Sequence, residues 1–297
     1  MRALRLATRQ SRLALAQSRQ VATAIEQAHP DVRVELVGLT TQGDRDQGDL
    51  TRHGGKGLFV TEVEQALLRG DADLAVHSLK DVPVTMPLTD GVDELVAAAI
   101  PTREDVRDVL ILRPGLDTLP VDARLGTSSP RRAMLMRHDR QDLRIVPFRG
   151  NVDTRLEKLR TGEVDATLLA AAGLRRLGLL DDVLDELSGL RLRILPTDDH
   201  PPAAGQGALL VQCRREEVDV RDLVRPLDDP AARRAVAVER RVVELLDGDC
   251  HSAIAAHAEP LDAERVRLTV ARARGDEVIQ RTVVASDAVA ANEALRS

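Results

Sequence analysis

A histidine, a lysine and an aspartate follow a short apolar run and could act together in acid–base or charge-stabilising chemistry. Residues 74–77 predict a strand, and the segment His-Ser-Leu-Lys-Asp at 77–81 overlaps its end. Open α/β sheets bind ligands outside the carboxyl ends of their strands. Asp81 lies beside Lys80, so we expect it to stay ionised and to stabilise a developing positive charge or relay a proton. A simple loop ion pair fits the same two residues.

A second candidate is the glycine loop Gly-Gly-Lys-Gly-Leu-Phe at residues 54–59, which leads into a predicted helix. It contains Lys56, one of only three lysines among 42 basic residues, and Phe59, one of only two phenylalanines. Free backbone N–H groups and a cation could bind an anion there. The spacing is not that of a P-loop, and a tight turn with a solvated lysine fits equally well.

Arginines are repeatedly placed at the starts of predicted helices. Arg131 and Arg132 fall in the first turn of a helix capped by Ser129, where the helix dipole disfavours cations. Because guanidinium groups capture carboxylates and phosphates, this placement indicates a polyanionic ligand. In so arginine-rich a chain, any single one also fits a plain surface position. The other candidates lie near predicted helix starts or strand ends: Arg9, Arg149, Arg155, Arg175 and Arg176.

Cys250 and His251 suggest a cysteine hydrolase, but their position argues against one. Cys250 follows the end of a predicted helix that starts at residues 229–230, where the helix dipole disfavours a thiolate. An ordinary loop cysteine fits, and so does a permanent covalent attachment made once. The only other cysteine is Cys213, and without a Cys-x-x-Cys pair we expect neither a disulfide nor a zinc site.

Composition limits the function classes further. The chain has 297 residues, a net charge of −6, two Phe and no Tyr or Trp. Proteins that bind single-stranded nucleic acid use aromatic platforms and basic surfaces, so we expect no nucleic-acid partner. No apolar run is long enough to cross a bilayer, and the first residues lack a signal-peptide pattern, so we expect a cytoplasmic protein with no membrane association.

Short apolar runs alternate with amphipathic stretches, which predicts an α/β fold with two related lobes and a small C-terminal α+β domain. The segment at residues 7–14 resembles the one at 126–133, and residues 68–74 resemble 159–166. We assign residues 1–97 and 199–217 to domain 1, 98–198 to domain 2 and 222–297 to domain 3. Predicted strands cover residues 4–8, 34–39, 74–77, 109–112, 124–126, 145–148, 166–170, 207–213, 253–258, 266–273 and 278–284, and predicted helices cover 12–27, 57–69, 130–137, 152–160 and 287–296.

Seven motifs occur in the order typical of one family. They are Ala-Thr-Arg-Gln-Ser at 7–11, Gly-Gly-Lys-Gly-Leu-Phe at 54–59, Ala-Val-His-Ser-Leu-Lys-Asp-Val-Pro at 75–83, Gly-Thr-Ser-Ser-Pro-Arg-Arg at 126–132, Arg-Gly-Asn-Val-Asp-Thr-Arg-Leu at 149–156, Ala-Ala-Gly-Leu-Arg-Arg-Leu-Gly at 171–178 and Gly-Gln-Gly-Ala at 205–208. Over roughly residues 4–258 the chain resembles the porphobilinogen deaminases.

The resemblance implies two lobes like those of periplasmic binding proteins and a dipyrromethane cofactor joined to Cys250 by a thioether. It implies a cytoplasmic, monomeric transferase that condenses four porphobilinogen molecules head to tail, with loss of ammonia, to hydroxymethylbilane in haem biosynthesis. Asp81 matches the catalytic carboxylate. Lys80, Ser129, Arg131 and Arg132 match cofactor-binding positions, and the matches for substrate binding are Arg9, Ser11, Arg149, Arg155, Arg176, Lys56 and Phe59.

The chain departs from the family around the cysteine. Asp249 precedes Cys250 and Ser252-Ala253 follow it, where the family usually has Gly-Gly-Cys and then Val-Pro. A two-lobed solute-binding or effector-sensing protein for a carboxylate-rich ligand is the alternative, because one fold can serve both functions. Such a protein would need neither Asp81 nor Cys250.

Overall fold

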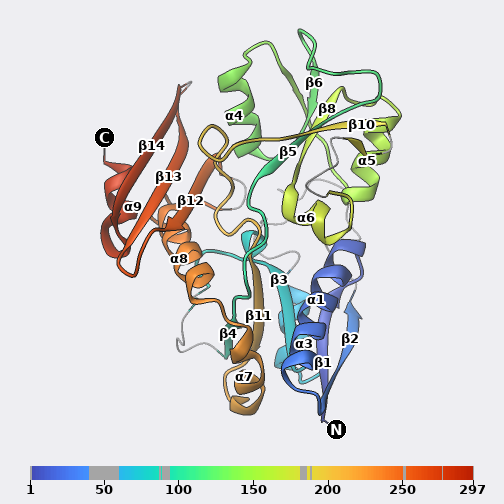
Figure 1. The fold of residues 1–297 in the computed structure, drawn as a ribbon, viewed down its shortest axis with the longest axis vertical. Helices are drawn as coiled ribbons and strands as arrows, with labels where there is room; N and C mark the ends of the chain where they lie inside the picture. The colour runs from blue at the N-terminus through green and yellow to red at the C-terminus, as the bar shows by residue number, and fades with distance from the viewer. Residues whose placement is uncertain are drawn as a thin grey trace. The chain divides into compact units, whose positions relative to one another are not determined.

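A computed structural model describes residues 2–39, 60–86, 88, 94–180, 186–187, 189–249, 252–275 and 277–296 (Figure 1). The chain divides into two compact units. The first contains Met1–Glu104 and Ala208–Ala237, and the second contains Asp105–Gly207 and Val238–Ser297. The division into three domains made from the sequence stays a prediction.

The first unit contains a five-stranded mixed sheet in the order β2-β1-β3-β11-β4. β1 pairs in parallel with both β2 and β3, whereas β11 runs antiparallel to β3 and β4. The strands are β1 (Arg2–Arg9), β2 (Val32–Leu39), β3 (Leu74–Ser78), β4 (Leu95–Ala99) and β11 (Leu209–Arg214).

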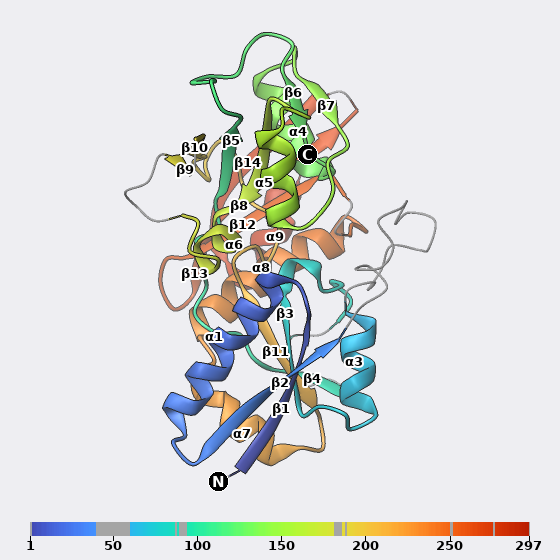
Figure 2. The ribbon, with the colours of Figure 1, turned by 90° about the vertical axis from the view of Figure 1, so that its right-hand side faces the viewer.

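Helices cover both faces of this sheet because successive strand residues point to opposite sides. Leu4 and Leu6 pack in the core on the side of α1 (Arg12–Ala28) and α7 (Val218–Val224). Ala7 packs on the side of α3 (Thr61–Leu68). Figure 2 shows α1 and α3 flanking β1. Two short 3₁₀ helices, η2 (Leu79–Asp81) and η3 (Arg225–Leu227), complete the described helices of this unit.

The second unit contains a six-stranded sheet in the order β7-β6-β8-β5-β10-β9. β6 is parallel to β7 and β8, and β5 is antiparallel to β8 and β10. α4 (Pro130–Asp139) packs on one face, and α5 (Val152–Arg160) and α6 (Ala171–Arg176) pack on the other. The strands are β5 (Asp108–Leu112), β6 (Arg124–Gly126), β7 (Arg144–Val146), β8 (Ala166–Ala170), β9 (Glu186–Leu187) and β10 (Leu190–Ile194).

The two sheets share one strand pattern, which confirms the repeat predicted from the sequence. The series β2-β1-β3-β11-β4 corresponds to β7-β6-β8-β5-β10, with an antiparallel strand in fourth place in each. The similar segments 7–14 and 126–133 lie where β1 leads to α1 and where β6 leads to α4. The similar segments 68–74 and 159–166 lie where α3 leads to β3 and where α5 leads to β8. The α/β class with two lobes is therefore confirmed.

A small antiparallel sheet, in the order β12-β13-β14, follows the long helix α8 (Pro230–Leu245). α9 (Asp287–Leu295) buries Ala290, Ala291 and Ala294. Leu135 of α4 packs with Ala255 and Ala271 of this sheet. This confirms the predicted C-terminal α+β segment, whose strands are β12 (Ile254–Pro260), β13 (Arg265–Arg274) and β14 (Glu277–Ser286).

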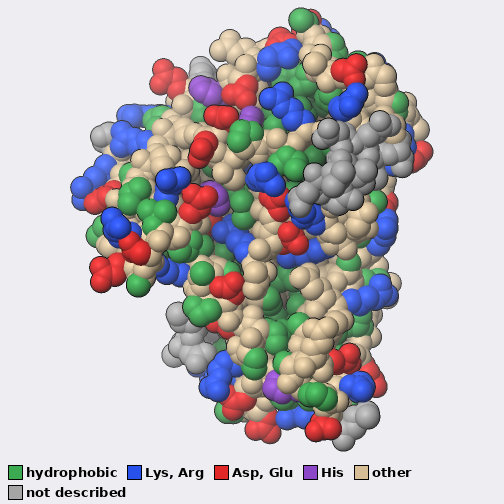
Figure 3. All heavy atoms as spheres, viewed as in Figure 1, with side chains coloured by type: hydrophobic (Ala, Val, Ile, Leu, Met, Phe, Trp, Pro, Cys, Tyr) green, Lys and Arg blue, Asp and Glu red, His purple; other side chains and the backbone are tan. Residues whose placement is uncertain are grey.

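Acidic and basic side chains are interspersed on the molecular face shown in Figure 3. Among the described residues, no helix is both long and apolar enough to cross a membrane. The same residues contain no group of three or more His, Cys, Asp or Glu side chains suited to a metal ion.

Candidate active site

In the first unit, two neighbouring parallel strands end beside each other and lead to the predicted catalytic residue and to two predicted substrate-binding residues. β1 leads to Arg9 and to Ser11, which caps α1 by accepting a hydrogen bond from the Ala14 N–H at 3.3 Å. β3 leads to Asp81 in η2. One small pocket is lined by Arg9, Asp81, Gln17, His77 and Ser78 together with apolar side chains. The structure thus brings Arg9 and Asp81 together, as the strand pattern predicts.

Asp81 is exposed, and its carboxylate makes no hydrogen bond or ion pair with any residue that the structure describes. The neighbouring Lys80 is half-buried. Within the described residues, the loop ion pair between these two side chains is absent. The carboxylate is therefore available to a cation that enters the pocket.

A chain of polar contacts connects His77, which lines this pocket, to Gln212 and Glu64. His77 Nε2 lies 3.0 Å from Gln212 Oε1, and Gln212 Nε2 donates to Glu64 Oε1 at 2.9 Å. Burial lowers the pKa of His77 to about 4, against a smaller opposing effect of Gln212. Burial also raises the pKa of Glu64. His77 is therefore neutral at neutral pH, and Asp81 and Arg9 supply the charge at the pocket wall.

In the second unit, the predicted basic residues follow three parallel strands at one edge of the sheet. β6 leads to Ser129, Arg131 and Arg132, β7 leads to Arg149 and Arg155, and β8 leads to Arg176. Because β6 is parallel to both β7 and β8, these segments emerge from the same side. Topology therefore places this whole set together on one edge.

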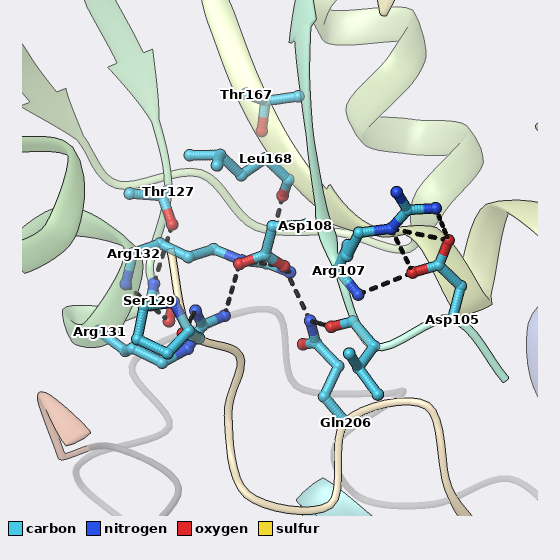
Figure 4. A network of polar contacts seen from close by, with 12 residues as sticks. Asp105, Arg107, Asp108, Thr127, Ser129, Arg131, Arg132, Thr167, Leu168 and Gln206 are labelled. Atoms are coloured by element: carbon cyan, nitrogen blue, oxygen red, sulfur yellow. Dashed lines mark hydrogen bonds and ion pairs between the residues drawn. The ribbon is translucent and has the colours of Figure 1, made fainter. Parts of the chain in front are cut away.

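Arg131 and Arg132 share one buried counter-ion, Asp108 (Figure 4). Arg131 Nη2 and Arg132 Nη2 each lie 2.7 Å from a different oxygen of that carboxylate, and all three side chains are buried. Burial alone would raise the pKa of Asp108, but the two guanidinium charges outweigh it and hold the pKa far below its usual range. The shared carboxylate offsets the unfavourable effect of the helix dipole on Arg131 and Arg132 in the first turn of α4.

Asp108 is a residue that the sequence analysis missed. The available signal was a single carboxylate heading the apolar run Asp-Val-Leu-Ile-Leu of β5. Gln206 also donates to Asp108 at 3.0 Å and to the Val106 carbonyl at 2.7 Å. Its motif, Gly-Gln-Gly-Ala, was noted without a role for the glutamine.

Among the described residues, two guanidinium groups of the buried network face one carboxylate, which leaves one positive charge uncompensated. Arg131 donates further to the Pro201 carbonyl at 2.9 Å, and Arg132 donates to the Leu168 carbonyl at 2.9 Å. Arg131 Nε is buried and has no hydrogen-bond partner among the described groups. Buried charges are normally paired, so this arrangement suits an anionic ligand.

The remaining residues of this edge have identifiable supports. Ser129 caps α4, with Pro130 at the first helical position, and Asn151 caps α5 by accepting from the Thr154 N–H at 2.9 Å. Arg155 Nε donates to the Gly150 carbonyl and Arg176 Nη2 to the Gly207 carbonyl, each at 2.8 Å. Arg149 is half-buried.

Cys250, Lys56 and Phe59 lie outside the described residues. On either side of the cysteine position, the Asp249 N–H donates to Ser252 Oγ at 2.9 Å, and Ser252 Oγ donates to Asp249 Oδ1 at 3.0 Å. Asp249 and Ser252, which both depart from the family pattern, are thus hydrogen-bonded to each other. Cys213 is fully buried in β11.

Fold and site together define a two-lobed α/β protein whose strand ends present basic side chains in one unit and an accessible carboxylate in the other. A family model described as "Porphobilinogen deaminase, dipyromethane cofactor binding domain" matches residues 4–222. The chain belongs to the porphobilinogen deaminase family.

Relatives from several bacteria agree with this assignment. "Porphobilinogen deaminase 1" of Streptomyces avermitilis is 45% identical over 284 residues, covering 92% of this chain and 83% of the relative. "Porphobilinogen deaminase" of Sorangium cellulosum is 46% identical over 258 residues, covering 86% and 82%. That of Bacillus pumilus is 39% identical over 292 residues, covering 97% and 90%.

The chain also has a weak resemblance to a solved binding protein. The aliphatic sulphonate binding protein SsuA of Escherichia coli has a TM-score of 0.41 at 12% identity, covering 83% of this chain and 71% of that one. The strand order described above, rather than this likeness, supports the fold.

Proposed function

We propose that this chain is a hydroxymethylbilane synthase, a transferase of tetrapyrrole biosynthesis. It condenses four porphobilinogen molecules head to tail, with loss of ammonia, and uses a covalently bound dipyrromethane primer. The observation that carries this function is the family match over residues 4–222. That match favours the enzyme over a solute-binding protein, the alternative that the sequence left open.

The site chemistry fits the charge of the substrate. Each porphobilinogen ring carries an acetate and a propionate, so a growing product accumulates carboxylates that repel one another. Guanidinium groups bind carboxylates in bidentate fashion. We assign substrate binding to basic and hydroxyl side chains at the strand ends and to two residues of the 54–59 loop: Arg9, Ser11, Arg149, Arg155, Arg176, Lys56 and Phe59.

Asp81 is proposed as the catalytic carboxylate. In each cycle the C–N bond of the aminomethyl group breaks and ammonia leaves, so the pyrrole ring left behind carries positive charge. A C–C bond then forms to the next ring, and that ring loses the proton from its reacting carbon. An accessible carboxylate can stabilise the cation and accept hydrogen bonds from pyrrole N–H groups.

The residues present fit the dipyrromethane that the family implies. The uncompensated buried charge and the unpartnered Nε of Arg131 suit its carboxylates. Lys80, Ser129, Arg131 and Arg132 are proposed to hold it. When bound, it supplies the pyrrole end from which the product grows. Because Cys213 is buried inside a sheet, Cys250 is the proposed site of the thioether.

Intact-mass analysis of the purified protein tests the proposal. We expect an increment equal to two linked pyrrole units, located on Cys250 by peptide mapping and absent from Cys250→Ser. A solute-binding protein would have the unmodified mass and would bind a carboxylate-rich ligand equally well after this substitution. An active Cys250→Ser variant without the increment would exclude the proposed attachment.

We further propose that the enzyme acts as a cytoplasmic monomer on a small-molecule substrate and needs no nucleic-acid partner. The family resemblance and the absence of an apolar spanning segment from the sequence support this setting. Light scattering coupled to size exclusion should give a mass near 32.4 kDa plus the attached group. A stable dimer would contradict the monomer.

A further inference from the structure

The chain of polar contacts from α3 through β11 to β3 is not used by the reaction described above. It starts at Glu64, passes through Gln212 and ends at His77, which lines the same pocket as Asp81. Gln212 is 1% exposed and His77 is 5% exposed. Three different elements therefore bring these side chains together, with Gln212 and His77 buried and Glu64 half-buried.

The chemistry of each group determines the orientation of the next. The amide nitrogen of Gln212 donates to Glu64 Oε1, which fixes the orientation of the amide. The amide oxygen then faces His77, and that oxygen can accept a hydrogen bond only from a protonated ring nitrogen. His77 Nε2 must therefore carry its hydrogen.

The charge of the ring determines whether the second ring nitrogen, Nδ1, carries a proton. Burial lowers the pKa of His77 to about 4, so the imidazole is neutral at neutral pH. A neutral imidazole carries one proton, and that proton is on Nε2. Nδ1 is therefore a hydrogen-bond acceptor.

We propose that Glu64 is a positioning residue for the known reaction: through the Gln212 amide it holds His77, which lines the same pocket as Asp81, as the neutral Nε2–H tautomer with Nδ1 as an acceptor. Porphobilinogen brings a pyrrole N–H and an ammonium group, and both are donors. A proton on Nδ1 would leave the ring without an acceptor for these donors, and a doubly protonated ring would add a positive charge to a residue of the pocket that must accommodate a cation. The inference rests on the proposed role of Asp81.

Nitrogen NMR on protein labelled in its histidines measures the tautomer directly. The chain has seven histidines, so the His77 signals are assigned by their loss in His77→Gln. We expect a protonated Nε2 and a bare Nδ1 throughout the neutral range. In Glu64→Gln the residue-64 side chain can both donate and accept, so Gln212 can reverse and the Nδ1–H form should appear.

Kinetics test whether this tautomer matters. Glu64→Gln and Gln212→Met should each lower kcat roughly three- to tenfold with little change in KM, the effect expected for a misdirected hydrogen bond. The double variant should be no slower than the slower single variant, because Glu64 acts only through Gln212. Glu35→Gln removes one exposed carboxylate of the same unit and should keep wild-type kinetics.

Two results would overturn the inference: a wild-type His77 with a proton on Nδ1, or a Glu64→Gln variant with an unchanged tautomer or an unchanged kcat. Additive losses in the double variant would also count against it. Asp81→Asn separates this inference from the proposed function. If that variant keeps full turnover, the catalytic assignment fails, whereas the tautomer measured by NMR in the wild type is unaffected.

Discussion

Two aspartates of similar intrinsic acidity have opposite tasks because their surroundings differ. Asp108 is buried, and its negative charge is neutralised by ion pairs with two guanidinium groups. Asp81 is exposed at the end of β3 and has no partner among the described residues. Only the second carboxylate can respond to charge that develops on a bound molecule.

Replacing Asp81 should therefore separate catalysis from cofactor attachment. In Asp81→Asn the amide keeps the shape but loses the charge, so we expect kcat to fall about 10²- to 10⁴-fold. The intact mass should still include the dipyrromethane increment. Turnover within a few-fold of wild type, measured with porphobilinogen, would refute the assigned role.

His77 should make the stability of the protein depend on pH. Its pKa of about 4 in the folded state lies below the value of about 6.5 in an unfolded chain. The unfolded state therefore binds more protons between these values, and stability falls as pH falls. The loss attributable to His77 between pH 7 and pH 5 is about 2 kcal/mol.

Urea unfolding of wild type and His77→Gln at both pH values isolates this contribution. The stability advantage of the wild type should shrink by about 2 kcal/mol on going to pH 5. A difference that is independent of pH would mean that His77 does not change its protonation on unfolding.

The positions of the site residues were predictable from the sequence, whereas their partners were not. Asp81, Ser129 and Arg131 follow apolar runs or cap helices, and such patterns are local. Asp108 and its partner Arg131 in α4 are 23 residues apart in the sequence, and Gln212 and its partner Glu64 are 148 residues apart. Nothing in the local pattern of either segment indicates such a pairing.

At the scale of elements, strong periodicity was read correctly and weak signals were missed. The helix predicted at 152–160 is α5, and the one at 12–27 is α1 extended by one residue. β4 was missed because its Leu-Val-Ala-Ala-Ala sequence lacks a clear strand signal. β10, with an alternating Leu-Arg-Leu-Arg-Ile pattern, was overlooked beside the Pro-rich segment that follows it.

Gly126 shows how one residue of an element supports the site. A Cβ at this position would lie 2.7 Å from the buried ring of Phe148, just before the turn that leads to Ser129 and α4. Gly126→Ala should therefore lower the free energy of unfolding by about 1–3 kcal/mol. Gly38→Ala is the matched control, since its Cβ would meet only the movable side chain of Gln10, and equal losses in both would contradict the argument.

For the whole molecule, the net charge is −6, yet the buried network of Arg131, Arg132 and Asp108 is positively charged. In Cys250→Ser, which should lack the cofactor, Arg131 and Arg132 keep their single counter-ion. A small anion that binds the folded state stabilises it by mass action. We expect orthophosphate to raise the Tm of this variant by several degrees and that of the loaded protein by less.

Differential scanning fluorimetry with and without orthophosphate, against chloride at equal ionic strength, measures this effect. The chloride series removes general screening from the comparison. Equal shifts in the loaded protein and in Cys250→Ser would show that the buried charge is not what the cofactor neutralises.

The place of β11 has a consequence for how the protein is made. All strands of the second sheet come from the continuous stretch between Asp108 and Ile194, whereas the first sheet receives β11 between β3 and β4 only afterwards. During translation the later lobe can complete its sheet first, and the earlier one must wait with two strand edges unpaired. The nascent chain should therefore be most vulnerable to aggregation, and most in need of a chaperone, until Leu209–Arg214 leaves the ribosome.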